Sequence, residues 1–389
     1  MLGTFALGMT GNVVTGLISQ FTEEFHISVS HAGLPLSIYA IGVALFGPIL
    51  RIVTLKYPPK PLMFVFMLVF VLSHIIAATA RSFDVLIISR ILASSMHAPY
   101  FGLSMMIAFN LSDPQRGSRS MALVQTGLSI AVMIGVPFGS LIGGMLDWRL
   151  VFWIITILGL VNVIGIALYL PDTKPSDTPL IRKELKILRN KDVLMISSVI
   201  LFGFSGVFST YAFIEPMLRK VSNFGITGVS IGLFFFGLGG VIGNILSGKI
   251  KSNSLTQGLF FALGSLSIVL LLFTTLLQFF ISALVMCFLL GAGTFGITPI
   301  FNAKIVMAAR EAPLLSGTLA ASVFNLASFI GATLGSLLLS IGFSYSHMTF
   351  VSSGLLALGM ILTKITSVFE DKTLFQEELE STSIVDSSS

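Results

Sequence analysis

Residues 171–192 read PDTKPSDTPLIRKELKILRNKD, and they form the longest polar stretch between two apolar segments of this 389-residue chain. The stretch holds three prolines and six lysines or arginines. Six long apolar segments precede it and six follow it. This layout predicts two structural units of similar size, joined by one charged connection.

The apolar segments on both sides are long enough to cross a bilayer, which takes about 20 mostly apolar residues in a helix. The chain is 54% hydrophobic and 10% charged, whereas about a quarter of the residues in soluble domains are charged. We therefore predict an all-α membrane protein with twelve transmembrane helices in two six-helix bundles. The predicted spans are 2–20, 33–54, 61–80, 84–108, 119–145, 149–170, 193–215, 227–248, 256–275, 278–300, 315–341 and 345–367.

The predicted spans also define the domains. Residues 1–170 form the N-terminal bundle, 171–192 a cytoplasmic central loop, and 193–367 the C-terminal bundle. The polar, acidic and serine-rich residues 368–389 are expected to form a disordered cytoplasmic tail.

The basic residues set the orientation, because Lys and Arg concentrate in cytoplasmic connections. With the N-terminus inside, seventeen of the 22 lie in connections or the tail on the inner side, and Arg90 lies within a span. The outer connections hold Arg81, Arg149, Arg219 and Lys220. We therefore expect a multi-pass protein of the plasma membrane with both termini in the cytoplasm.

Several classes of protein lack support in the sequence. The single cysteine, Cys287, permits neither an intramolecular disulfide nor a cysteine metal cluster. A glycine-rich phosphate loop and a catalytic constellation are both missing. The sequence therefore predicts no enzyme, no cofactor, no metal and no nucleic-acid partner. Its expected partners are the lipid bilayer, a small-molecule solute and protons, and we expect a monomer.

Polar side chains inside membrane spans are costly and are therefore candidate functional groups. Arg90, Ser94 and His97 are spaced i, i+4 and i+7, so they share one face of a helix. At 1.5 Å per residue, Arg90 lies roughly 9 Å and His97 roughly 20 Å from the outer end. The stripe either lines a cavity that binds an anionic or hydrogen-bonding solute, or Arg90 extends to the interface and His97 bonds a neighbouring helix.

Six further polar residues within the predicted spans are candidates for solute binding. The alternatives are interhelical hydrogen bonds for the amides and core packing for the tyrosines. The six are Asn12, Tyr39, Gln125, Tyr211, Asn302 and Asn325.

Small residues recur along the predicted span 119–145. Gly135, Gly139 and Gly143 are four residues apart and would let two helices approach closely. Pro137 lies among them and bends a helix by freeing a backbone carbonyl. These four residues form either a conformational pivot or a close-packing surface.

Glu215 precedes Pro216 near the outer end of the predicted span 193–215. A half-buried carboxylate can carry a proton when desolvation raises its pKa. The alternative is an interfacial residue held by water or by Arg219. With His97, whose residue type titrates near neutral pH, Glu215 is our candidate for proton coupling.

Several short motifs resemble the major facilitator superfamily, in particular arabinose-efflux-type and chloramphenicol-efflux-type permeases of the twelve-span drug:proton antiporter family. The likeness covers about residues 8–340. Its motifs are YAIG (39–42), MHAPYFG (96–102), GVPFG (135–139), DWR (147–149), YAFIEP (211–216), GVIGN (240–244) and FNL (324–326).

The resemblance implies a secondary active transporter that exports a small organic solute by alternating access with proton antiport. Drugs, sugars, nucleosides and purines are the implied solute classes. Two features depart from the pattern: Gly11 occupies the place of a glutamate in the first span, and the loop after the second span lacks its aspartate. A proton-independent facilitator or importer, and a non-transporting membrane sensor with the same fold, therefore stay open as alternatives.

Overall fold

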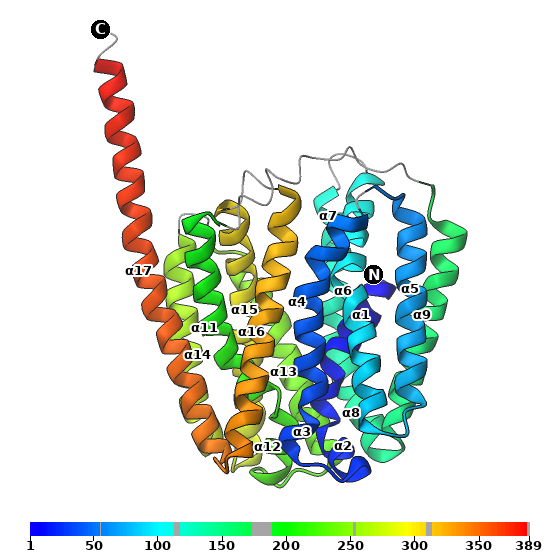
Figure 1. Ribbon diagram of the computed structural model, residues 1–389. Coiled ribbons are helices and arrows are strands. Elements are labelled where there is room, and N and C mark those ends of the chain that lie inside the picture. The colour runs from blue at the N-terminus through cyan, green and yellow to red at the C-terminus, as the bar shows by residue number, and fades with distance from the viewer. Residues whose placement is uncertain (55, 113–116, 173–188, 252–253, 309–312, 387–389) are drawn as a thin grey trace.

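The computed structural model describes residues 1–54, 56–112, 117–172, 189–251, 254–308 and 313–386. These residues form helices joined by short connections, and no strand occurs among them (Figure 1). The first part of the chain contains α1 (Leu2–Asn12), η1 (Val13–Gly16), α2 (Ile18–Phe25), α3 (Val29–Ala32), α4 (Leu34–Thr54), α5 (Pro59–Ala78), α6 (Phe83–Asn110), α7 (Gly117–Ile130), η2 (Ala131–Gly135), α8 (Val136–Met145) and α9 (Trp148–Tyr169). The second part contains α11 (Lys191–Tyr211), α12 (Ile214–Lys220), α13 (Ile226–Ser247), α14 (Leu255–Leu276), α15 (Phe280–Ala308), α16 (Pro313–Ser340) and α17 (Tyr345–Asp386).

The described residues include 11 helices long and apolar enough to cross a membrane, or up to 12 if a bent pair counts as one span. The bent pair replaces the straight span predicted over 2–20. Helix α1 continues through the 3-10 turn η1, and α2 then leaves at 63°. Val13, Val14 and Thr15 are β-branched and Gly16 has no side chain, so this turn has low helix propensity.

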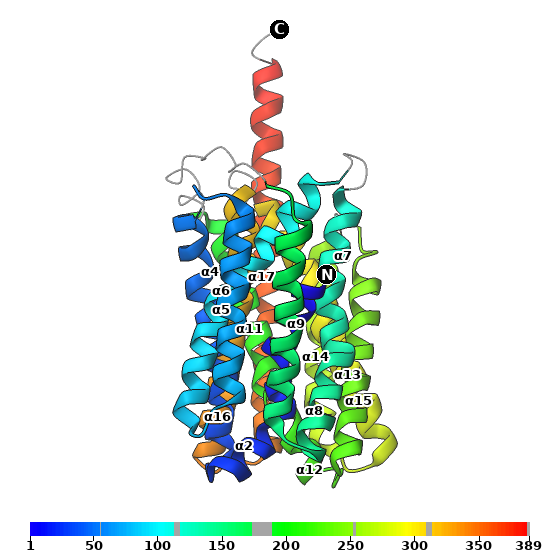
Figure 2. The same ribbon diagram turned by 90° about the vertical axis from the view of Figure 1, so that its right-hand side faces the viewer.

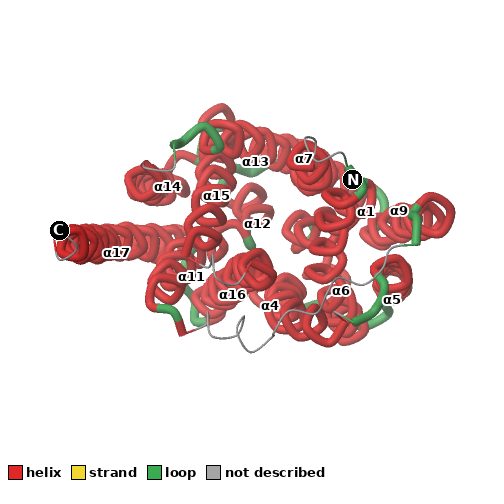
Figure 3. Tube along the Cα trace, turned by 90° about the horizontal axis from the view of Figure 1, so that it is seen from above, coloured by secondary structure: helices red, strands yellow, loops and turns green. Residues whose placement is uncertain are grey.

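The two ends of the helix bundle differ in what they carry. Tyr169 ends α9 and Lys191 begins α11 at the same end, from which α17 extends far beyond the other helices (Figures 1 and 2). We call this end the central-loop face. The short helices α2, α3 and α12 lie at the opposite face, and in the view along the bundle α12 lies between the longer helices (Figure 3).

Helix α17 differs from the sequence-based expectation for the tail. It continues to Asp386, where disorder was expected over 368–389. The sequence FEDKTLFQEELE at 369–380 is rich in Glu, Leu, Lys and Gln, all of which favour helix. This intrinsic propensity explains a helix in a segment too polar to bury a core.

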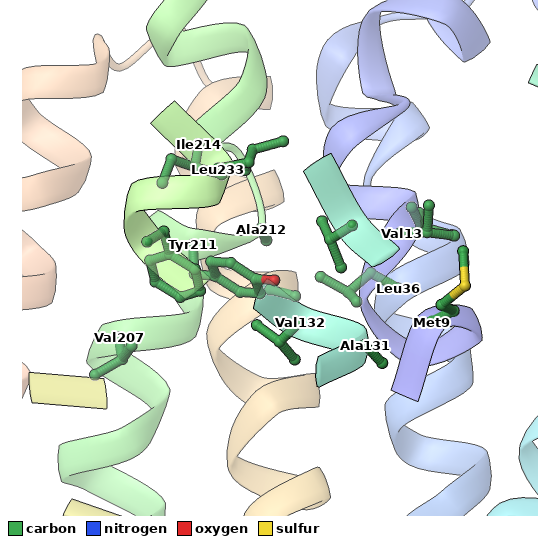
Figure 4. Packing of buried hydrophobic residues seen from close by; sticks show 14 of the residues in the cluster. Met9, Val13, Leu36, Ala131, Val132, Val207, Tyr211, Ala212, Ile214 and Leu233 are labelled. Carbon is green, nitrogen blue, oxygen red and sulfur yellow. The ribbon is translucent and has the colours of Figure 1, made fainter. Parts of the chain in front are cut away.

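Large apolar side chains are exposed on the outer surfaces of the helices, as expected for contact with lipid. Leu45, Ile49 and Val53 on α4 and Ile157 and Ile164 on α9 are examples, each more than half exposed. The buried core contains apolar residues from both parts of the chain. In Figure 4, Tyr211 extends from α11 toward Val132 of η2 within this core.

The first and second parts of the chain meet along two pairs of helices. Helix α4 packs on α16, and α8 with η2 packs on α13. The backbones of α13 and η2 approach closely at Gly237, because a Cβ there would meet the backbone of Met133 and lie 2.9 Å from the carbonyl oxygen of Val132. The predicted bundle boundaries at 1–170 and 193–367 remain a prediction.

Candidate functional site

A buried hydrogen-bond chain joins α1, α5 and α6 inside the first part of the protein. Arg90 Nη1 donates to Thr10 Oγ1 at 2.9 Å, and Thr10 Oγ1 lies 2.6 Å from His74 Nε2. On its other side, His74 Nδ1 lies 2.7 Å from the carbonyl oxygen of Phe70. Arg90 and His74 are both fully buried. We call Arg90, Thr10 and His74 the buried triad.

The direction of each hydrogen bond in the buried triad follows from donor chemistry. The guanidinium of Arg90 can only donate, and the carbonyl of Phe70 can only accept. His74 Nδ1 therefore carries a proton, and Thr10 Oγ1 accepts from Arg90. With His74 neutral, the Thr10 hydroxyl donates its single proton to Nε2.

Arg90 is a buried cation without an ion-pair partner in the described part of the chain. Its Nε and Nη2 also lack hydrogen-bond acceptors among the described residues. Its guanidinium carbon lies 4.8 Å from the ring centroid of Phe152 and 5.9 Å from that of Tyr39. These rings give a modest cation–π stabilisation. The side chain points into the protein, so the alternative in which Arg90 extends to the interface is wrong.

His97 pairs with Tyr39 next to the buried triad. The Tyr39 hydroxyl lies 2.6 Å from His97 Nδ1, and the imidazole is partly exposed. This hydrogen bond joins α6 to α4, as in the alternative interpretation that His97 bonds a neighbouring helix. Ser94, one turn from His97, bonds the carbonyl of Ile91 at 2.7 Å and packs against Gly42 of α4. Arg90, Ser94 and His97 share one face, as predicted. Ser94 and His97 contact α4, whereas Arg90 bonds Thr10 of α1.

Asn12 and Tyr211 meet between the first and second parts of the chain. The Tyr211 hydroxyl donates to Asn12 Oδ1 at 3.3 Å. Thr15 Oγ1 donates to the carbonyl of Asn12 at 2.7 Å and lies 3.5 Å from the Tyr211 hydroxyl. The ring of Tyr211 stacks on Phe236 of α13, with ring centroids 4.5 Å apart. Two residues predicted separately from the sequence are thus direct partners.

Glu215 is fully buried on α12 and outside the membrane-spanning helices, because the preceding span ends at Tyr211. Ser19 on α2 donates its backbone N–H and its hydroxyl to Glu215 Oε2, at 3.1 and 2.9 Å. Arg219 Nε pairs with Oε1, which confirms the predicted partner. The predicted position within a span and the half-buried state are wrong, because the chain breaks at Ala212 and α12 then places Glu215 against α2.

Burial raises the pKa of Glu215, and the Arg219 charge and the hydrogen bonds from Ser19 oppose this effect without cancelling it. A second contact near the same face joins Ser336 Oγ to the carbonyl of Ser30 at 2.7 Å. The first and second parts of the chain are therefore held together by hydrogen bonds at the opposite face.

The remaining candidates are not brought to the buried triad. Gln125 is partly exposed on α7, and Asn302 is exposed on α15. Asn325 Nδ2 donates to the carbonyl of Ala321 in its own helix at 2.9 Å. Among the residues that the structure describes, no group of three or more His, Cys, Asp or Glu is placed to hold a metal.

The glycines of the predicted span 119–145 face the broken first span. A Cβ at Gly135 would lie 2.6 Å from Met9, at Gly139 it would meet Val13, and at Gly143 it would meet Leu17. These contacts confirm the close-packing reading. The turn before Pro137 is the π-helix η2, a form that often occurs at functional sites.

Sequence reasoning missed Thr10, His74 and Ser19. A histidine within the apolar run 61–80 was a signal for His74, since ionisable groups inside spans are rare. Thr10 and Ser19 gave no signal, because serines and threonines are common in membrane helices and bond their own backbone there.

Comparisons with known proteins agree with this architecture. The sequence model of the Major Facilitator Superfamily matches residues 1–332. The chain is 36% identical over 379 residues to the MFS-type transporter YfhI of Bacillus subtilis strain 168, covering 97% of this chain and 96% of that protein. It is 28% identical over 365 residues to a probable sugar efflux transporter of Helicobacter pylori strain G27, covering 92% of each.

A solved structure shows the same fold. The crystal structure of the human organic anion transporter MFSD10 (TETRAN) matches with a TM-score of 0.66 at 17% identity, covering 93% of this chain and 98% of that one. The chain therefore belongs to the Major Facilitator Superfamily and is a multi-pass membrane transporter rather than an enzyme. The family resemblance drawn from the sequence is confirmed.

Proposed function

We propose that this protein exports a small organic solute across the plasma membrane by alternating access, in exchange for protons. The observation that carries the proposal is the position of the hydrogen bonds between the two parts of the chain. They run from Asn12 and Tyr211 to Glu215 and Ser336, toward the face opposite the central loop. A transporter that alternates must break and remake such contacts on one side at a time.

The basic residues assign sides to the two faces. Under the positive-inside rule, the central-loop face is cytoplasmic and both termini lie inside. The opposite face, with the contact between Ser19 and Glu215, is then the outer face. The hydrogen bonds between the two parts would then lie at the outer face, as expected for the state in which an exporter loads its solute from the cytoplasm.

Sugars are the first solute class to test. The Helicobacter pylori relative is named as a probable sugar efflux transporter, and Asn12, Tyr39, His97 and Tyr211 offer the amide, phenol and imidazole groups that bond sugar hydroxyls. We propose that these four residues line the solute path with Arg90 and Ser94. Drugs, nucleosides and purines are the further classes for the same assay.

Proton coupling has a specific competitor, which is a facilitator that moves solute downhill. Gly11 favours this second candidate, because it leaves α1 without a carboxylate. His97 and Glu215 are the proton carriers proposed from the sequence. Each has a hydrogen-bond partner that a change of protonation would alter, namely Tyr39 and Ser19.

The experiment uses everted membrane vesicles from an overexpressing strain, in which export becomes uptake. Radiolabelled sugars, nucleosides, purines and antibiotics are offered with an acid-inside pH gradient and, in parallel, without one. Gradient-driven accumulation of one class, absent from vesicles without the protein, supports the proton-coupled exporter. Equilibration that ignores the gradient supports the facilitator, and no uptake of any class contradicts both.

A further inference from the structure

We infer that His74 is the proton-binding residue of the transport cycle and that it acts on Arg90 through the hydroxyl of Thr10. This inference rests on the proposed function, because it assigns a site to the proton of that exchange. The supporting observation is the buried triad, in which a proton added to His74 Nε2 must reverse the hydrogen bond that this atom accepts from Thr10.

In the unprotonated triad, the hydroxyl of Thr10 and both ring nitrogens of His74 have hydrogen-bond partners. Thr10 Oγ1 accepts from Arg90 and donates to His74 Nε2, while His74 Nδ1 donates to the carbonyl of Phe70. A proton on Nε2 turns that atom into a donor. Thr10 Oγ1 then faces two donors, and its own proton needs a new acceptor.

A protonated His74 would also place two cations on one threonine oxygen. The neighbours of His74 are Thr10 from α1, Arg90 from α6, the ring of Phe152 from α9, and Ser73 and Phe70 of its own helix. Arg90 is the one charged group among these neighbours. None of them is a carboxylate, so nothing offsets the added charge, and the Thr10 hydroxyl no longer bridges the two residues as it does in the unprotonated triad. The contact that holds α1 to α5 and α6 is therefore weakened.

Movement of α1 reaches the contacts that close the outer face. Asn12 lies two residues after Thr10 and bonds Tyr211 of the second part. Thr15 in η1 contacts the same hydroxyl, and Ser19 in α2 holds Glu215. The chain from Thr10 to Ser19 thus links protonation of His74 to opening of the outer face, which is the direction that proton-driven export requires.

His97 and Glu215 fit this role less well. His97 bonds Tyr39 on α4, and both residues lie within the first part of the chain. Glu215 forms an ion pair with Arg219 of its own helix. Protonation of Glu215 therefore breaks a salt bridge within α12. Neither residue shares a hydrogen-bond partner with Arg90, whereas His74 shares Thr10 with it.

The test needs no knowledge of the solute, since its ligand is the proton. Cysteines replace Arg81 and Gln278, which are exposed at the outer face in the first and second parts, in a Cys287→Ser background. Spin labels there report the distance between the two parts in nanodiscs from pH 8.5 to 5.5. We expect the population of the longer distance to grow about fivefold as the pH falls.

The variants separate His74 from its rivals. In His74→Gln, the amide nitrogen can donate to Phe70 and the amide oxygen can accept from Thr10, so the unprotonated arrangement is fixed and the pH response should disappear. Thr10→Val should also abolish the response, because it removes the hydroxyl between His74 and Arg90, and Thr10→Ser should keep it. His97→Gln and Glu215→Gln should each still show the longer-distance population growing as the pH falls, because both keep the buried triad intact.

A full pH response in His74→Gln, or none in the parent, overturns the inference. A response lost in Glu215→Gln and kept in His74→Gln overturns it in favour of Glu215. The vesicle assay separates this failure from failure of the proposed function. Gradient-driven accumulation by His74→Gln would refute the role of His74 and leave the exporter intact, whereas a pH response without uptake of any solute would refute the exporter alone.

Discussion

Ser19 donates both its backbone N–H and its hydroxyl to one carboxylate oxygen of Glu215, at 3.1 and 2.9 Å. The N–H belongs to the first turn of α2, where backbone donors have no partner within the helix. The carboxylate satisfies that donor and meets the positive end of the helix dipole. The break between η1 and α2 thus creates a new helix N-terminus in the first part of the chain. Glu215 of the second part binds to this N-terminus.

The stability of this docking contact should depend on pH in a defined direction. Burial raises the pKa of Glu215, and Arg219 is the main opposing influence. A carboxyl group whose pKa is raised by folding contributes stability below its ordinary pKa, and the contribution is lost as the pH rises through the raised value. We therefore expect the free energy of unfolding of wild type, relative to that of Glu215→Gln, to decrease as the pH rises from the ordinary pKa of a glutamate to the raised pKa of Glu215.

A thiol-reactive dye that reports exposure of Cys287, which is fully buried in the folded protein, measures this difference during heating. The dye reaction is read after adjustment to one common pH, so that thiol ionisation does not contribute. A relative stability that grows with rising pH would show that Arg219 and Ser19 outweigh burial and would contradict the prediction.

Gly139→Leu should yield an inserted protein with transport reduced at least about tenfold. The added side chain meets Val13 directly and Val151 at 3.2 Å from the new Cβ, so it forces the first span away from α8. Gly165→Leu is the matched control, since no atom lies within 4 Å of a Cβ there. Equal transport rates in the two variants would refute the pivot role of the glycines.

Gly237→Ala tests the contact between α13 and η2. The new methyl group meets backbone atoms of Met133 and Val132, which cannot rotate away as a side chain can, so we expect a loss of about 1–3 kcal/mol of stability. Gly354→Ala adds the same methyl group in open space and should have little effect. Thermal unfolding of both variants measures the difference, and the idea fails if Gly237→Ala unfolds at the wild-type temperature.

The sequence predicted the long helices well because length and apolar content alone decide whether a segment spans a bilayer. It predicted the first span poorly. The break after Gly16 results from β-branched residues, which single-residue propensities mark only weakly, and from Glu215, which holds Ser19 from a point 196 residues away. Such a partner cannot be found by reading neighbours along the chain.

The candidate site was predicted in part for a similar reason. The spacing of Arg90, Ser94 and His97 gave their common face, because helix periodicity is local. The partners of Arg90 were missed because Thr10 and His74 lie on other helices. The choice between a hydrogen-bonded His97 and a solute-facing one likewise depended on Tyr39, which belongs to α4.

The orientation is tested with single cysteines in a Cys287→Ser background. Pro175→Cys and Ser387→Cys, at positions outside the described residues, should react with a membrane-impermeant maleimide only after the cells are opened. Arg81→Cys, exposed at the opposite face, should react in intact cells. Labelling of either of the first two in intact cells would reverse the orientation drawn from the basic residues.

Arg90→Met should make the protein more stable and less active. Arg90 is fully buried, and within the described residues it has no ion-pair partner and no acceptor for Nε and Nη2. Transferring a charge out of water costs several kcal/mol, and the rings of Phe152 and Tyr39 return a modest part of that cost. Methionine is apolar and of similar length, and Thr10 can still donate to His74 in its absence. We expect a gain of about 1–4 kcal/mol in stability, in line with replacements of buried ionic groups by apolar ones.

Transport by Arg90→Met should be lost, since the guanidinium belongs to the buried triad and to the solute path that we propose. Arg90→Lys is the matched control: it keeps the charge but has neither the planar face that stacks on Phe152 nor a second nitrogen, so it should be no more stable than wild type. Thermal unfolding and vesicle uptake are measured on the same preparations. If Arg90→Met is both less stable and inactive, Arg90 is chiefly a structural residue. If it is more stable and fully active, the guanidinium has no part in transport. Only a more stable, inactive variant fits a charge that is kept for function at the expense of stability.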